Sequence, residues 1–217
     1  MRALTWNLYH GRSPAPAGRS LLREFADALA GWEWDVALLQ EVPPWWPDPL
    51  ARAAGASWRS VLTSRNFGLP VRRAISSRNP DLLKANGGGC NAILVRGAIA
   101  EHRAVRLTCR PERRWAHGVR LADGTWAVNV HASTHREVWA LRDTLRALAC
   151  ARAWAGAAPL LFGGDLNLHG RPALPGMTRL ASNHVDHLFS SGAPAAGRRE
   201  VLERGRLSDH PPVRVTL

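Results

Sequence analysis

Two short motifs near the carboxyl end of this 217-residue chain carry residue types suited to acid and base chemistry. Gly-Gly-Asp-Leu-Asn at 163–167 follows an apolar run, and Ser-Asp-His at 208–210 precedes a final apolar run. The two glycines predict a sharp turn that leaves Asp165 and Asn167 at the carboxyl end of a buried strand. Ligands and catalytic groups collect at that end of α/β sheets. We therefore treat these residues and His210 as candidate catalytic groups, with a local Asx turn as the alternative for the first pair.

Polar side chains lie at the ends of other predicted strands as well. They are Asn7, Glu41, His131, Asp186 and Asp209. Oxygen ligands such as Asn7, Glu41 and Asp209 suit Mg²⁺ or Mn²⁺, whereas zinc would want more His or Cys. Beside such an ion a carboxylate can deprotonate water, and an imidazole can donate to a phosphoryl oxygen. Together these residues predict phosphoester hydrolysis, although Asn7 alone is more typical of a turn and Glu41 of a charge at a helix entry.

Hydrophobic periodicity predicts strands that alternate with helices, and hence an α/β protein with mixed, partly antiparallel sheets. The expected strands are 3–6, 36–39, 57–62, 91–95, 99–107, 115–122, 125–130, 160–162, 185–189 and 212–217. The expected helices are 19–29, 48–54 and 135–154. The apolar side chains of the third helix include Val138, Leu141, Leu145 and Leu148. Residues 63–89 and 190–199 show little periodicity and are expected to be loops.

Composition limits the class of protein. The length suits one domain spanning 1–217, no apolar stretch is long enough for a membrane helix, and no secretory signal is evident, so we expect a cytoplasmic location. Three cysteines without metal-type spacing argue against a disulfide framework and a zinc site. The formal net charge is +12, almost entirely from arginine. Such a charge favours a phosphate-rich partner, although a GC-rich coding bias explains it equally well.

Several residues outside the motifs are candidates for substrate contact. The basic side chains of the segment 63–89 can follow a phosphate backbone, and the Trp pair after Glu41 can stack on a base or pack inside the protein. We favour packing for one tryptophan of the pair and contact for the other. The candidates are Arg65, Arg72, Arg73, Arg78, Asn91, Trp45 and Trp46. His10, His135, His169 and His184 are expected to be solvated loop residues.

The order of the motifs resembles the endonuclease/exonuclease/phosphatase superfamily, over nearly the whole chain. Each block is weak alone, but the ordered set is specific. The blocks are Thr-Trp-Asn at 5–7, Gln-Glu at 40–41, Asn-Ala-Ile-Leu at 91–94, Val-Asn-Val-His at 128–131, Gly-Gly-Asp-Leu-Asn at 163–167, Val-Asp-His-Leu-Phe at 185–189 and Ser-Asp-His-Pro at 208–211.

The resemblance implies a four-layer sandwich, with two mixed sheets face to face and helices outside. It also implies that Glu41 binds a divalent metal, with Asn7 and Asp209 assisting. Asp165 would activate the attacking water and Asn167 would bind the phosphoryl group. His210 would contact the scissile phosphate, held by Asp186, and His131 would donate to the phosphate or the leaving oxygen.

The substrate is less determined, because the family acts on many phosphoesters. His131 stands where abasic-site repair enzymes of the family usually have a different motif, so the chain is more similar to the nucleases and sphingomyelinases. We expect a metal-dependent phosphodiester hydrolase whose partner is nucleic acid, with no stable membrane association and no obligate protein partner. The alternatives are a phosphomonoesterase, a sphingomyelinase-like phospholipid diesterase, or a non-catalytic nucleic-acid-binding module.

Overall fold

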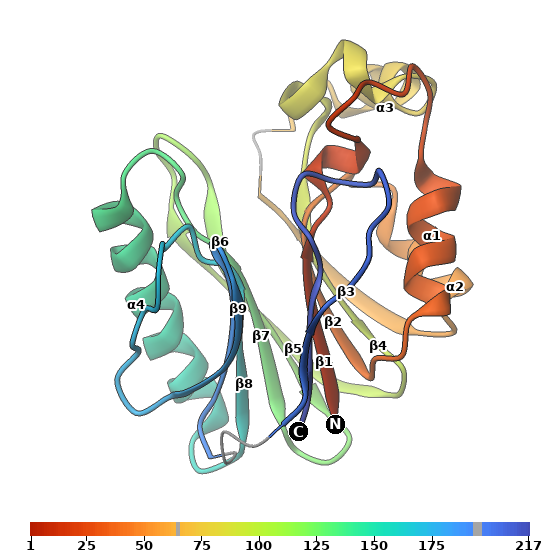
Figure 1. Cartoon of the computed structure of the whole chain (residues 1–217). Coiled ribbons are helices and arrows are strands. Elements are labelled where there is room, and N and C mark those ends of the chain that lie inside the picture. Colours follow the sequence, from red (N-terminus) through yellow and green to blue (C-terminus); the bar gives the residue numbers. More distant parts are fainter. Residues whose placement is uncertain (64–65, 193–196) are drawn as a thin grey trace.

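A computed structural model describes residues 1–63, 66–192 and 197–217. In this part of the chain two mixed β-sheets of six strands each pack face to face, and helices cover the outer face of each sheet (Figure 1). This is the expected four-layer α/β sandwich. The chain termini lie side by side at the end of the sandwich remote from α3 (Leu69–Ser76).

The two sheets, here called A and B, are built from the two halves of the chain, except that the last two strands return to sheet A. The strands of sheet A are, in spatial order, β11 (Arg199–Val201), β12 (Val213–Thr216), β1 (Arg2–Asn7), β2 (Val36–Val42), β4 (Cys90–Val95) and β3 (Ser57–Leu62). The strands of sheet B are, in spatial order, β5 (Ile99–Thr108), β6 (Arg114–Leu121), β7 (Trp126–His131), β8 (Leu160–Asp165), β10 (Asp186–Ser190) and β9 (Thr178–Asn183).

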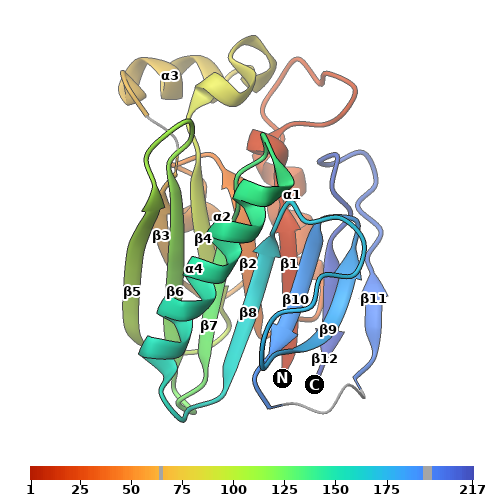
Figure 2. The ribbon, with the colours of Figure 1, turned by 90° about the vertical axis from the view of Figure 1, so that its left-hand side faces the viewer.

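Helices pack on the outer faces of the sheets, as Figure 2 shows for α4 (Glu137–Ala155) on sheet B. On sheet A, α1 (Leu22–Gly31) and α2 (Pro47–Ala53) bury an apolar cluster that includes Phe25 and Leu50. A separate apolar cluster, which includes Leu38 and Leu161, lies between the two sheets. Short 3₁₀ turns occur at η1 (Tyr9–Gly11), η2 (Pro80–Leu82) and η3 (Lys84–Gly87).

The strand before Asp165 continues through both glycines, so the predicted sharp turn at 163–164 is wrong. Gly164 has φ +131°, and a Cβ atom there would overlap the carbonyl oxygen of Val130 on the parallel neighbour β7. A Cβ atom at Gly163 would overlap the carbonyl oxygen of His187 on β10. The glycines therefore allow the three strands to approach each other closely while β8 carries Asp165 to its last position.

The third helix forms as expected, but of the four apolar side chains named for it only that of Leu148 is buried. Leu141 and Leu145 are each 40% exposed, whereas Ala140 and Ala147 are fully buried. Small side chains allow the helix to lie close to sheet B, and this favours the alanine face over the leucine face. The buried face also includes Asp143, whose contact near the site is described below.

Five elements in two parts of the chain escaped the sequence prediction. The segment 63–89 contains α3 and two 3₁₀ turns, and the edge strands β9 and β11 were not expected. Pro70 in the first turn of α3 is compatible with a helix start, because its missing N–H has no partner there in any helix. In β9 the two buried residues, Leu180 and Ala181, are adjacent rather than alternating, and β11 has only three residues, too few for a pattern.

Substitution of Gly164 by Ala is expected to lower the free energy of unfolding by about 3 kcal/mol or more, because overpacking adds to the strain of a positive φ. Gly55→Ala is the matched control. Gly55 follows the end of α2 with φ +62° and open space around a Cβ atom, so about 1 kcal/mol is expected there. Urea denaturation monitored by circular dichroism measures both values, and equal losses would contradict the close-packing explanation for Gly164.

Candidate active site

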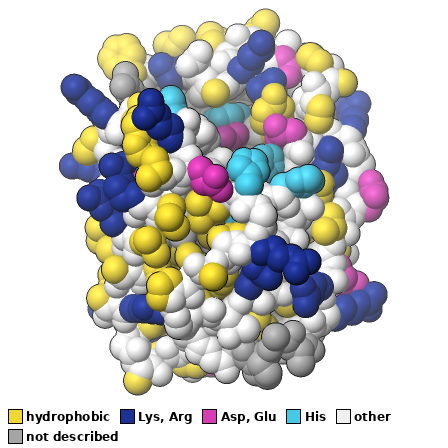
Figure 3. Space-filling view, turned by 60° about the vertical axis from the view of Figure 1, so that its left-hand side comes forward, with side chains coloured by type: hydrophobic (Ala, Val, Ile, Leu, Met, Phe, Trp, Pro, Cys, Tyr) yellow, Lys and Arg dark blue, Asp and Glu magenta, His cyan; other side chains and the backbone are white. Residues whose placement is uncertain are grey.

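The ends of five strands bring polar side chains to one rim between the sheets. In the parallel pair β1 and β2, Asn7 lies level with Gln40, and in the parallel pair β7 and β8, His131 lies level with Asp165. The antiparallel β10 begins at Asp186, directly opposite Asp165. Figure 3 shows carboxylate and imidazole side chains gathered on one face of the molecule, with arginine or lysine side chains beside them.

Asp165 is the centre of this cluster. Its Oδ2 accepts a hydrogen bond from Asn7 Nδ2 at 2.9 Å, and His131 Nε2 lies 3.6 Å from the same oxygen. His131 Nε2 is also 3.9 Å from Glu41 Oε1. The contacts join β1 and β2 of sheet A to β7 and β8 of sheet B, so the cluster exists only where the two sheets meet.

Asn167 combines the local turn with a place at the site. Its backbone N–H donates to Asp165 Oδ1 at 3.1 Å, which is an Asx turn, and its Nδ2 donates to the carbonyl of Ala132 at 3.0 Å. The residue has φ +49°, a conformation that asparagine tolerates better than most residues. The two explanations considered for this motif are therefore compatible, because the turn holds the amide next to Asp165.

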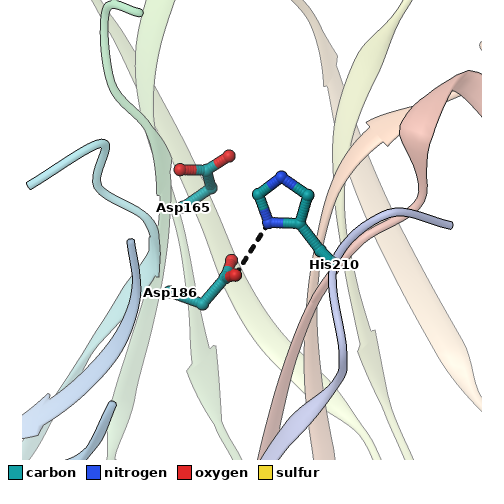
Figure 4. Close-up of side chains that lie close together, drawn as sticks. All are labelled: Asp165, Asp186 and His210. Atoms are coloured by element: carbon teal, nitrogen blue, oxygen red, sulfur yellow. Dashed lines mark hydrogen bonds and ion pairs between the residues drawn. The ribbon is translucent and has the colours of Figure 1, made fainter. Parts of the chain in front are cut away.

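Asp186 and His210 form the hydrogen-bonded pair of the site (Figure 4). His210 Nδ1 lies 2.8 Å from Asp186 Oδ2, and Asp165 faces the pair from β8. One ligand atom from each of these three residues lies within 4.8 Å of the others. Asp209, next in the chain, is more exposed and its Oδ1 is 3.9 Å from His210 Nε2.

Ser208 does not line the pocket, but its hydrogen bonds position His210. It is fully buried and donates from Oγ to the carbonyl of Asn7 at 2.7 Å, while the backbone N–H of His210 donates to the same Oγ at 3.0 Å. Trp6 Nε1 donates to the carbonyl of His210 at 2.8 Å. The Ser-Asp-His motif is thus fixed to the end of β1 by two hydrogen bonds, and a third within the motif ties His210 to Ser208.

The two site histidines have pKa values displaced in opposite directions. Burial, together with the positive charges of Arg114, His10 and His210, holds the pKa of His131 well below its usual range. Burial also acts to lower the pKa of His210, but the hydrogen bond to Asp186 and the nearby carboxylates outweigh it and raise the pKa to about 9. At neutral pH His131 is therefore neutral and His210 is protonated.

The carboxylates are displaced toward the protonated form. Burial, followed by the charge of Asp186, raises the pKa of Asp165 to about 7. Burial also raises the pKa of Asp186, although its bond to His210 opposes the change. Burial therefore makes the ionised forms of both carboxylates unfavourable, and a bound cation would stabilise those ionised forms.

His10 lies at the site, although it was expected to be a solvated loop residue. Its Nε2 is 3.2 Å from Glu41 Oε2, and its Nδ1 is 3.2 Å from the carbonyl of Gly88. Both His10 (φ +54°) and Glu41 (φ +50°) have left-handed backbone conformations. Strain of this kind is common at functional sites. No local sequence signal identifies His10, because its partners are distant in the chain. His135, His169 and His184 are exposed, as expected.

A second contact missed by sequence analysis supports the loop after His131. Asp143 of α4 is fully buried, and its Oδ2 accepts hydrogen bonds from Ser133 Oγ at 2.5 Å and from the Ser133 backbone N–H at 3.2 Å. This bond explains why the helix turns Asp143 inward. The segment that carries His131 and the carbonyl of Ala132 is fixed to the outer helix.

A pocket of about 290 Å³ opens beside the cluster. Glu41 and His131 line it together with His10, Arg113 and Arg114. Arg114 forms an ion pair with Glu112, which also lines the pocket. The pocket gives a ligand access to Glu41 and His131, and its positive side chains suit an anionic group.

The predicted substrate-binding residues are only partly near this pocket. Asn91 is fully buried within β4, and Trp46 is 2% exposed and packs on Phe25 with ring centroids 5.4 Å apart, so neither can touch a substrate here. Trp45 lines a separate apolar groove with Arg73. Arg72 and Arg78 belong to α3 and the turn after it and do not line the pocket. Arg65 lies outside the described residues.

The comparisons with known proteins agree with this geometry. The model of the Endonuclease/Exonuclease/phosphatase family matches residues 4–210. The chain belongs to this family. Members are phosphoesterases that typically use divalent metals, and the resemblance of the motifs is thereby confirmed. A search of curated proteins found no match.

Solved structures from several organisms share the fold of this chain. A family protein from Beutenbergia cavernae is 18% identical, with a TM-score of 0.73 over 99% of this chain and 70% of that one. Truncated TDP2 from Caenorhabditis elegans is 16% identical, with a TM-score of 0.70 over 99% and 96%. A mannosyl-6-phosphatase from Bacteroides thetaiotaomicron is 16% identical, with a TM-score of 0.63 over 100% and 98%. At these identities the likeness shows the fold alone.

Among the described residues, none of the helices has the length and apolarity that crossing a membrane requires.

The Asp186→Asn variant is expected to lower the pKa of His210 by about two pH units, because it removes the carboxylate that stabilises the imidazolium. Histidine NMR titration in the presence of a chelator measures this change. Asp209→Asn is the control, and its exposed carboxylate should matter less. The pKa of His210 in the folded protein is above the unfolded value of 6.5. Protonated His210 therefore stabilises the fold fully below pH 6.5, and this stabilisation is lost as the pH rises through about 9. A pKa that stays near 9 in Asp186→Asn would contradict the assignment.

Proposed function

We propose that the protein is a divalent-metal-dependent phosphodiester hydrolase that acts on nucleic acid. The observation that carries the proposal is the meeting of Asp165, His131 and the Asp186–His210 pair at one rim, beside a pocket lined by arginine. A base, a fixed proton donor and positive charge are the groups that phosphoester hydrolysis requires.

The residues present fit a divalent cation. Burial raises the pKa of Asp165 and Asp186, and Asp186 Oδ1 is buried without a hydrogen-bond partner among the described residues. Glu41 faces the pocket, and the other ligands we propose for the metal are Asn7 and Asp209. The oxygen-rich donor set favours Mg²⁺ or Mn²⁺. When bound, the ion would stabilise negative charge that develops on the phosphoryl oxygens.

The side chains of the site can share the remaining steps. Asp165 accepts the proton of the attacking water, since its pKa of about 7 is close to the working pH of a general base. Protonated His210, oriented by Asp186, donates a hydrogen bond to a phosphoryl oxygen. Neutral His131 donates one N–H to the phosphate or the leaving oxygen, and the amide of Asn167 holds the phosphoryl group.

A nucleic acid is our first choice of substrate because the positive charge extends beyond the pocket. A phosphomonoester is the second candidate, since the fold is shared with a mannosyl-6-phosphatase. Both candidates share the catalytic groups, so only a substrate panel separates them. Location in the cytoplasm accords with such a substrate and is part of the proposal.

Asp165→Ala and His210→Ala are each expected to lower kcat for bis(p-nitrophenyl) phosphate by about 10² to 10⁴-fold, because the first removes the base that accepts the proton of water and the second removes a charged hydrogen-bond donor to the phosphoryl group. Plasmid DNA, RNA and mannose 6-phosphate complete the panel, which is run with Mg²⁺ or Mn²⁺ and with chelator. Asp27→Ala on the exposed face of α1 is the control. If wild-type protein free of contaminating nuclease cleaves no diester, the proposal is rejected, and turnover of the monoester alone would favour the second candidate.

Glu41→Gln is expected to raise the Mg²⁺ concentration for half-maximal activity by about 10-fold or more, since it removes a charged ligand. Binding of Mn²⁺ followed by electron paramagnetic resonance gives an independent measurement without turnover. The matched control is Glu101→Gln, because Glu101 pairs with Arg103 and Arg120 on sheet B outside the pocket. Unchanged metal affinity in Glu41→Gln would exclude Glu41 as a ligand.

A further inference from the structure

A second hollow, here called the β9 groove, lies outside the pocket that contains Glu41. It has a volume of about 560 Å³ and is formed by the loop after β8, the edge strand β9 and the edge strand β11. Its lining residues are Gly170, Arg171, Arg179, Ser182, Asn183, His184 and Arg199. Among the described residues that line it are three guanidinium groups and an imidazole but no carboxylate. The hollow is therefore built for an anion.

The arginines of the β9 groove are not used by the fold. Across the described ranges, Arg171, Arg179 and Arg199 take part in no ion pair, whereas the neighbouring Arg198 pairs with Glu200. They come from three separate segments, so their meeting is not a consequence of a local charge run. Positive groups that converge without acidic partners repel each other, and an anion between them removes the repulsion.

A neutral donor adds to this charge. Asn183 Nδ2 is buried and finds no acceptor among the described residues. A buried donor without an acceptor is unfavourable, and because Asn183 lines the groove, a small rotation of its side chain would let the oxygen of a ligand satisfy it. The combination of guanidinium groups with an unsatisfied amide suits a phosphate, which accepts several hydrogen bonds.

The groove is connected to the catalytic rim through one hairpin. Asn183 pairs with Asp186 across the turn between β9 and β10, so the groove and the Asp186–His210 pair lie on either side of that turn. His187, next to Asp186, contacts Ser182 Oγ at 2.9 Å and the Leu168 carbonyl at 2.7 Å. In Figure 3, arginine or lysine side chains gather just below the histidine and carboxylate side chains.

From this arrangement we infer that the β9 groove binds a non-scissile phosphate of a nucleic-acid strand whose scissile phosphate lies at His210. The inference rests on the proposed function and deepens it, because a sugar monophosphate has no second phosphate to place there. Arginine contacts to the backbone position a strand without reading its sequence. The groove would thus determine the preference for polymers over small esters.

The test compares two variants that lose the same charge. The groove variant carries Arg171→Ala, Arg179→Ala and Arg199→Ala, and the control carries Arg23→Ala, Arg52→Ala and Arg146→Ala on the exposed faces of α1, α2 and α4. Single-stranded and duplex 20-nucleotide DNA and bis(p-nitrophenyl) phosphate are the substrates. Fluorescence anisotropy with chelator measures DNA binding without turnover, and thermal melting checks that each variant is folded.

For the groove variant, kcat/KM for DNA should fall about 10-fold or more relative to kcat/KM for the small diester. The fall should come from a higher KM for DNA. The slope of log affinity against log salt should become shallower by about 1 for each DNA phosphate that the variant no longer binds. The preference of the wild type for longer oligonucleotides should also weaken.

Equal losses of DNA affinity in both variants would overturn the inference, because a general effect of net charge would then explain them. A parallel loss on both substrates would also overturn it. The role of the groove is tested by DNA binding in the presence of chelator, which requires no turnover. The hydrolase proposal is tested separately, by turnover of the small diester by the wild type.

Discussion

Gln40 and Asn129 tie the two sheets together directly beneath the catalytic rim. Gln40 Nε2 donates to Asn129 Oδ1 at 2.8 Å, and Asn129 Nδ2 donates to the carbonyls of Leu39 at 2.8 Å and Ala92 at 3.0 Å. Elsewhere between the sheets the contact is largely apolar, which fixes the separation but allows sliding. Directional bonds across the interface fix the relative height of β2 and β7. Because the catalytic cluster takes residues from both sheets, its geometry depends on this link.

The burial and the short distances between side chains in the cluster also determine their pKa values. Burial raises the pKa of the carboxylates on β8 and β10, the charge of Asp186 adds to the rise at Asp165, and Asp186 holds a protonated imidazole that comes from the other sheet. His131 stays neutral because it is buried among positive groups. Two imidazoles in one site thus differ in protonation at the same pH, which separates their roles. Neither state could be inferred from residue type, since both depend on groups that the fold brings from other strands.

The sequence predicted what local patterns encode. Strand ends placed Asn7, His131 and Asp165 at one rim, because parallel neighbours end at the same edge. His10 was missed because its contact with Glu41 follows from a left-handed turn and not from a pattern. The glycines at 163 and 164 were misinterpreted, since glycine within a strand also marks a close approach of backbones. Trp45 and Trp46 are adjacent and chemically equal, yet one lies in the core and the other lines a groove, and only the packing of α1 against α2 decides between them. The exposure of Leu141 and Leu145 on α4 was not predictable for a related reason, because the depth at which a helix packs depends on side-chain size and on the inward bond of Asp143.

Net charge illustrates how structure refines an ambiguous composition. Several arginines serve the fold: Arg96 donates to carbonyls at the end of α1, Arg214 pairs with Glu200, and Arg12 pairs with Asp81. A coding bias toward arginine would account for residues of this kind and for solvated ones on the helices. It does not account for arginines that converge from separate segments on one groove without an ion-pair partner in the described part of the chain, because convergence is a property of the fold. The formal charge of +12 therefore indicates little about the partner, whereas the location of these arginines favours a phosphate-bearing chain next to the catalytic rim.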